Sequence, residues 1–82
     1  MFEEMNSVRD QIEDLLLDSG FCEDLFYITK ERTRIIVMFD CKEAVDYFRG
    51  DFEYHELSQK YRYQYAIDGK RHCAVISKRV ET

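Results

Sequence analysis

Residues 61–78 read YRYQYAIDGKRHCAVISK. Two runs rich in aromatic and β-branched side chains flank Asp68-Gly69, a dipeptide that readily adopts the positive φ angles of a tight turn. With Asp68-Gly69 as a two-residue turn, Tyr65 lies opposite His72 and Ile67 lies opposite Lys70. The stretch therefore predicts a β-hairpin with strands over about residues 60–67 and 70–79.

The two faces of this hairpin differ in chemistry, because successive side chains of a strand point to opposite sides. One face carries Tyr61, Tyr63, Tyr65 and Ile67 opposite His72, Ala74 and Ile76. The other face carries Lys60, Arg62, Gln64 and Ala66 opposite Arg71, Cys73, Val75 and Ser77, with Arg79 beyond. The tyrosine face has more apolar area to remove from water, so we expect it to face the core.

Each orientation of the hairpin predicts a different exposed surface. With the tyrosines inside, the outer face is a basic stripe of Lys60, Arg62, Arg71 and Arg79, together with Gln64. In the reverse orientation a small core of Ala66, Cys73 and Val75 is buried. The tyrosines then form a stacking platform of the kind that single-stranded nucleic acids use.

The upstream sequence predicts two helices. Apolar residues recur at helical spacing over residues 4–19, and Gly20 ends this first helix. Asp40 with Glu43 resembles a capping box at the start of a second helix, whose apolar face begins at Cys41 and which ends at Gly50. Residues 51–59 are expected to be irregular or helical.

Between these helices the sequence predicts a second hairpin. Its strands are Leu25–Thr29 and Arg34–Phe39, and its tip is Glu31-Arg32. One face carries Phe26, Ile28, Ile35, Val37 and Phe39, and the other carries Leu25, Tyr27, Ile36 and Met38. A sheet covered on one side alternates apolar and polar residues more cleanly. We therefore expect helices or a partner over the second face, where Leu25, Tyr27, Ile36 and Met38 would suit a two-fold dimer interface.

The elements follow the order α-β-β-α-β-β. Two hairpins, each preceded by a helix, predict an α+β fold with one antiparallel sheet of about four strands and two helices on one face. Eighty-two residues without a linker or repeat indicate a single domain over residues 1–82.

Charge is distributed unevenly along the chain. The net charge is −5; residues 1–57 hold 15 acidic and 6 basic side chains, whereas residues 58–82 hold 2 and 6. The carboxylates of the acidic first helix, Glu13 and Asp14 among them, can imitate the phosphates of a nucleic-acid duplex or dock on a basic partner. The basic hairpin could bind nucleic acid, although the anionic molecule as a whole opposes approach to phosphate.

No motif indicates catalysis, a cofactor or a metal. His72 and Cys73 are neighbours on a strand, so their side chains diverge and cannot act as base and nucleophile. Cys22, Cys41 and Cys73 lack the paired spacing of a zinc site, and Cys41 and Cys73 suit a core. Asp40 and Glu43 are explained as helix caps rather than as magnesium ligands.

These features predict a small non-enzymatic interaction module in the cytoplasm, inhibitor-like, which docks on a larger protein. The alternative is nucleic-acid binding through the C-terminal hairpin. A homodimer is a further expectation, and no membrane segment is expected. The expected binding residues are Arg62, Gln64, Arg71, Arg79, Tyr63, Tyr65, Glu13 and Asp14.

Overall fold

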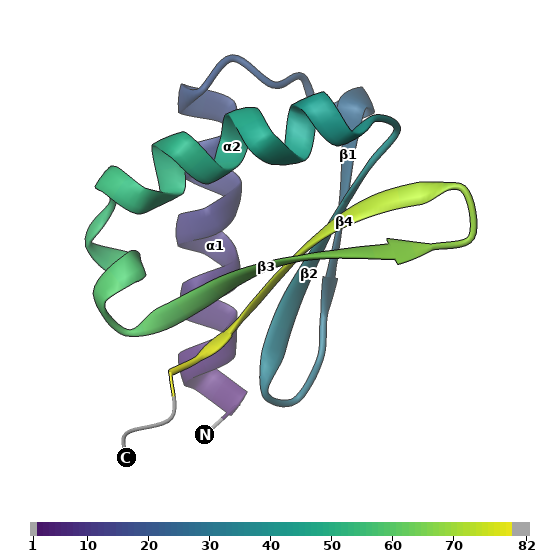
Figure 1. Ribbon diagram of the computed structural model, residues 1–82. Helices are drawn as coiled ribbons and strands as arrows, with labels where there is room; N and C mark the ends of the chain where they lie inside the picture. The colour runs from purple at the N-terminus through teal and green to yellow at the C-terminus, as the bar shows by residue number, and fades with distance from the viewer. Residues whose placement is uncertain (1, 80–82) are drawn as a thin grey trace.

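The structure, a computed structural model, describes residues 2–79 (Figure 1). Its elements are α1 (Phe2–Asp18), the short 3₁₀ helix η1 (Glu23–Leu25), β1 (Phe26–Lys30), β2 (Arg34–Phe39), α2 (Lys42–Tyr54), the 3₁₀ helix η2 (Glu56–Gln59), β3 (Tyr61–Asp68) and β4 (Arg71–Lys78). The strands form one antiparallel sheet in the order β1-β2-β4-β3. Both helices pack on the same face of the sheet, which confirms the expected α+β fold and order of elements.

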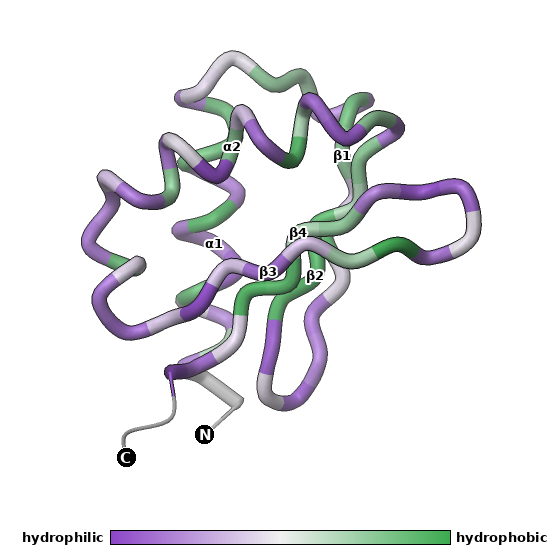
Figure 2. The backbone as a smooth tube through the Cα atoms, in the orientation of Figure 1, coloured by the Kyte–Doolittle hydropathy of each residue, from purple (hydrophilic) through white to green (hydrophobic). Residues whose placement is uncertain are grey.

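The core lies between the two helices and the inner face of the sheet. It is formed by Met5, Val8, Ile12 and Leu16 of α1, Val45, Phe48 and Phe52 of α2, and the inward residues of the strands, among them Ile35, Val37, Phe39, Ala74 and Ile76. Phe48 joins the layers, because its ring lies about 6 Å from the rings of Phe21, Phe39 and Tyr63. Figure 2 shows hydrophobic segments in β2 and β4 and hydrophilic residues at both hairpin turns.

The tyrosine face of the C-terminal hairpin points inward, as predicted. Tyr61 is buried, and its hydroxyl donates a hydrogen bond of 2.7 Å to Glu4. The Tyr63 hydroxyl donates to the carbonyl oxygen of Val45, also at 2.7 Å. The Tyr65 hydroxyl is hydrogen-bonded to Nδ1 of His72. Because each buried hydroxyl has a partner, the tyrosines enter the core without leaving a polar group unsatisfied.

The predicted turn of this hairpin is wrong by one position. Asp68 lies opposite Arg71, so the two turn residues are Gly69 and Lys70 rather than Asp68 and Gly69. Gly69 has φ +64°, which a residue without a Cβ adopts at little cost. Opposed residues therefore change, and Tyr65 faces Ala74 instead of His72. The shift amounts to two residues in the pairing, which leaves every side chain on its predicted face.

The first hairpin shows the same shift. The backbone N–H of Glu31 donates to the carbonyl oxygen of Arg34 at 2.8 Å, so Arg32 and Thr33 form the tip in place of Glu31 and Arg32. An ion pair between the side chains of Glu31 and Arg34 also spans this turn. Leu25 belongs to η1 and not to β1, which begins at Phe26.

The second helix differs from its prediction at both ends. Cys41, not Asp40, is the N-cap of α2, and it makes no side-chain capping bond. Cys41 is exposed, so it does not fill the core. The helix continues through Gly50 to Tyr54, because Phe52 extends the buried stripe of Val45 and Phe48. Residues 51–59 are mainly helical, within the range of structures expected for them.

Gly20 and Gly50 provide a matched test of this description. Gly20 has φ +96° and ends α1, where the N–H of Phe21 bonds to the carbonyl oxygen of Leu16. Gly20→Ala is expected to lower the free energy of unfolding by roughly 1–2 kcal/mol. Gly50→Ala, in a helix with no atom near the added Cβ, is expected to raise it by up to about 1 kcal/mol. Urea unfolding measures both changes, and equal signs would contradict the assignment.

Candidate protein-interaction surface

The outer face of the sheet carries a band of apolar side chains. Strand pairing aligns Tyr27, Met38, Cys73 and Ala66 in one row across all four strands, and Thr29, Ile36, Val75 and Gln64 in the next row. Among the described residues no helix covers this face, since α1 and α2 both pack on the other side. Ile36, Met38, Val75 and Ala66 are partly exposed, and Tyr27 is 61% exposed. We call the eight residues of the two rows the open face: Tyr27, Thr29, Ile36, Met38, Gln64, Ala66, Cys73 and Val75.

A shallow hollow gives this surface its shape. It has a volume of about 320 Å³ and lies over the middle strands, lined by Ile36, Met38, Val75, Cys73 and Ala66 with polar residues around them. A second hollow, of about 330 Å³, lies beside it and is more polar, because Asp24, Asp40 and Arg71 line it together with Leu25, Tyr27 and Met38. Shallow, open hollows of this kind suit side chains of a partner protein better than an enclosed small molecule.

Arginines border the open face. Arg34 and Arg62 lie at one end of the strands, and Arg71 lies at the other, beside Asp68. Arg34 is paired with Glu31, whereas no ion pair involves Arg62 within residues 4–79. The Arg71 guanidinium contacts the sulfur of Met38 at 3.9 Å and so lies against the apolar band. Carboxylates lie on the same border, because Glu31 and Asp68 line the first hollow and Asp24 and Asp40 line the second, so the border carries both signs of charge.

Cys73 is buried even though it belongs to the outer face. Its row neighbours Met38 and Ala66 lie on either side of it. Burial raises the pKa of the Cys73 thiol, and the nearby carboxylate of Asp68 raises it further. The thiol is therefore held in its neutral form, which makes it a packing group rather than a nucleophile. His72 points to the helix side toward Tyr65, so the His72-Cys73 pair diverges as the sequence indicates.

The structure brings some of the predicted site residues together and separates others. Arg62, Gln64 and Arg71 share one surface with Tyr27, Ile36 and Met38, so part of the expected basic stripe joins the expected dimer positions on a single face. Lys60, also expected in the stripe, lines the cleft between α1 and η2 instead. Leu25 lies at the margin of the face, in η1. Tyr63 and Tyr65 face the core under α2, so the alternative of an exposed stacking platform is wrong.

The remaining predicted residues lie elsewhere. Arg79 follows β4, and its side chain donates to the carbonyl oxygen of Ser58 at 3.0 Å, which ties it to η2. Glu13 and Asp14 lie on α1, on the opposite side of the molecule from the open face, and Glu13 is 3.5 Å from Arg9. Sequence reasoning did not join Val75, Cys73 and Ala66 to the apolar positions of β2. The alternation of side chains assigned each of these residues to the outer face of its own hairpin. The sequence did not show that β4 pairs with β2.

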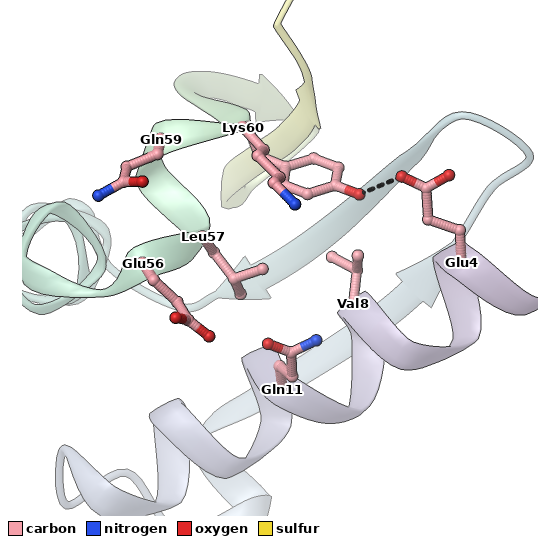
Figure 3. A pocket seen from close by; sticks show the side chains of 8 residues that line it. Glu4, Val8, Gln11, Glu56, Leu57, Gln59 and Lys60 are labelled. Atoms are coloured by element: carbon pink, nitrogen blue, oxygen red, sulfur yellow. Dashed lines mark hydrogen bonds between the residues drawn. The ribbon is translucent and has the colours of Figure 1, made fainter.

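A cleft of about 420 Å³ separates α1 from η2 (Figure 3). Its apolar wall is formed by Val8, Leu57 and Tyr61, and its polar margin by Glu4, Gln11, Glu56, Gln59 and Lys60. The hydrogen bond from Tyr61, and Lys78 at 3.7 Å, hold the pKa of the Glu4 carboxyl below its ordinary value. Among the described residues that line the cleft there is no His, Cys or Ser. Glu4 therefore serves to fasten α1 to β3, and the open face is the better candidate site.

Within residues 4–79 no cluster of three or more His, Cys, Asp or Glu side chains is arranged to hold a metal ion. Neither described helix has the length and apolar character needed to span a bilayer. No protein-family model matches the chain, and no curated protein or solved structure matches it either.

Proposed function

We propose that this chain is a non-enzymatic protein-binding module that docks on a larger protein through the open face of its sheet. The observation that carries the proposal is the apolar band across all four strands on a face that α1 and α2 leave uncovered. A solvated antiparallel sheet normally presents polar residues on its outer side. Contiguous exposed apolar area of this kind typically marks an interaction site.

The chemistry of the border describes the partner. Arg34, Arg62 and Arg71 surround the apolar band, and arginine is favoured at interfaces because its guanidinium pairs with carboxylates in a fixed geometry. Carboxylates, among them Asp40 and Asp68, lie on the same border. A complementary partner offers apolar side chains for the band, with carboxylates placed to meet the arginines and cationic groups placed to meet the carboxylates.

The test compares variants on opposite sides of the molecule. Ile36→Glu places a charge in the middle of the apolar band, and Asp14→Arg alters α1 on the far side. A protein captured by the wild-type chain is purified and titrated with each variant. We expect Ile36→Glu to weaken its binding at least tenfold, about 1.4 kcal/mol. Asp14→Arg should leave the affinity unchanged.

The same variants separate this proposal from nucleic-acid binding. The wild-type chain is titrated into labelled single-stranded and duplex oligonucleotides at low and near-physiological salt. Binding that persists at physiological salt and is lost in Arg62→Ala and Arg71→Ala would contradict a protein partner on this face. Equal affinity of the captured protein for Ile36→Glu and wild type would contradict the open face as the docking surface.

A further inference from the structure

The free edge of the sheet at β3 is a surface distinct from the open face. In this antiparallel pair, alternate residues of β3 direct their backbone groups toward β4. The bond from the Arg79 N–H to the Lys60 carbonyl oxygen establishes that the even-numbered residues do so. Tyr61, Tyr63, Tyr65 and Ile67 therefore direct their N–H and C=O groups outward. No backbone partner is present for these groups of Tyr63, Tyr65 and Ile67 within the described chain.

Two common protections against strand pairing are absent from this edge. The register of β3 is continuous over eight residues, without a bulge, and the chain contains no proline. The other edge strand, β1, has only five residues. Ile67, at the far end of β3, is 63% exposed although it is a large apolar side chain. A second strand beside β3 would satisfy the backbone groups and cover Ile67.

The sequence of β3 is compatible with a second copy of the same strand beside it. On its outer side β3 carries Arg62 near its start and Asp68 at its end, with Gln64 and Ala66 between them. Antiparallel pairing about a two-fold axis at Gln64 places Gln64 opposite Gln64 and Arg62 opposite Ala66, so no like charges oppose each other across the pair. On the inner side it places Tyr63 opposite Tyr65 and Tyr61 opposite Ile67, which are favourable cross-strand pairs.

The helix above this edge has the same symmetry. Lys42, Asp46, Arg49 and Glu53 recur at helical spacing along α2. The Lys42 ammonium lies 5.7 Å from the ring centre of Tyr65, and the Arg49 guanidinium lies 5.4 Å from that of Tyr63, so this stripe lies over β3. The charges along this stripe alternate between positive and negative. Two such helices side by side and antiparallel pair Lys42 with Glu53 and Asp46 with Arg49, each twice.

The β3 pairing and the charged stripe of α2 occupy the same stretch of the edge. The β3 pairing is centred on Gln64, between Tyr63 and Tyr65, and the charged stripe of α2 spans those same two tyrosines. In this arrangement the carboxylate of Asp46 in the second copy would lie beside the Arg49 guanidinium.

We infer that two copies of this chain associate about a two-fold axis through β3, forming a continuous eight-stranded sheet with four helices on one face. Each copy contributes the same strand and the same helix, as an isologous interface requires. The open face is left uncovered, because the second copy adds at the edge. The dimer therefore presents two open faces and buries neither of them. This inference does not depend on the proposed function.

The test uses two charge reversals. Each is expected to prevent dimer formation when present alone, and the two variants are expected to form a dimer when mixed. Asp46→Arg places two arginines against each other across the axis, and Arg49→Asp places two aspartates there. Light scattering coupled to gel filtration should give twice the 9.9 kDa chain mass for the wild type and one chain mass for each single variant at the same concentration. An equimolar mixture of the two variants should return to twice the chain mass, because every pair across the axis is then opposite in charge.

Two controls separate the interface from a loss of folding. Asp14→Arg, on exposed α1, makes the same change in charge as Asp46→Arg and should remain dimeric. Hydrogen exchange reports the strand pairing directly: the amides of Tyr63, Tyr65 and Ile67 should be protected in the wild type and exposed in Asp46→Arg. A wild type of one chain mass at millimolar concentration, or a mixture that stays monomeric, would overturn the inference. A dimer whose β3 amides exchange freely would also overturn it.

Discussion

Phe48→Ala is expected to lower the free energy of unfolding by about 3–5 kcal/mol. The Phe48 side chain is fully buried, and its ring contacts those of Phe21, Phe39 and Tyr63, which come from the loop after α1 and from two strands. Removing it opens a cavity where the layers meet. A domain of this size has a total stability of roughly 4–12 kcal/mol, so the variant would be close to unfolded at room temperature.

Urea unfolding followed by circular dichroism measures this effect. The control is Tyr54→Ala, another aromatic residue of α2, whose side chain is 95% exposed. That substitution should change the free energy of unfolding by no more than about 0.5 kcal/mol. Similar losses in the two variants would show that α2 does not present the Phe48 face to the sheet.

The free energy of unfolding is expected to fall at alkaline pH, in a range where Tyr61 and Tyr63 are still protonated in the folded state. Burial, followed by the hydrogen bond to the Glu4 carboxylate, raises the pKa of Tyr61 to about 12. Burial also raises the pKa of Tyr63 above its ordinary value. An unfolded tyrosine ionises near pH ~10, so above that pH the unfolded state releases protons that the folded state retains.

The sign of the effect follows from this difference. The stabilising contribution is complete below pH ~10 and is lost as the pH rises toward about 12. From Tyr61 alone, we expect the free energy of unfolding to fall by about 2 kcal/mol across this interval. Urea midpoints at a series of alkaline pH values measure the fall.

Phenylalanine variants identify the groups responsible. Tyr61→Phe and Tyr63→Phe should each reduce the slope of stability against pH, because the group that titrates is gone. An unaltered slope in Tyr61→Phe would contradict the buried hydrogen bond between Tyr61 and Glu4.

Most of the secondary structure could be predicted because its signals are local. The periodic apolar residues Val8, Ile12 and Leu16 identify α1, and the strand range Arg34–Phe39 agrees with β2. Both turns were misplaced by one position, yet no side chain changed face, because a two-residue shift preserves the alternation of a strand. The end of α2 was misjudged because a helical glycine costs only about 1 kcal/mol, which Phe52 outweighs through burial.

The candidate site was less accessible to sequence reasoning. The sequence assigned Arg62 and Arg71 to one outer face and Ile36 and Met38 to another, and treated them as separate surfaces. They form one surface because β2 pairs with β4 in the centre of the sheet. That pairing joins segments more than thirty residues apart, and local composition does not specify it.

By itself, the sequence determined which side chains share a face within each helix and strand, because these periods are properties of the local backbone. It favoured an inward orientation for the tyrosines of β3, since their apolar area exceeds that of the other face, but it left the reverse orientation open. Only the tertiary structure decided the strand order and placed the charged stripe of α2 above the edge of β3. The reason is physical: strand order and helix placement follow from burying all the apolar faces together, and no single segment contains that information.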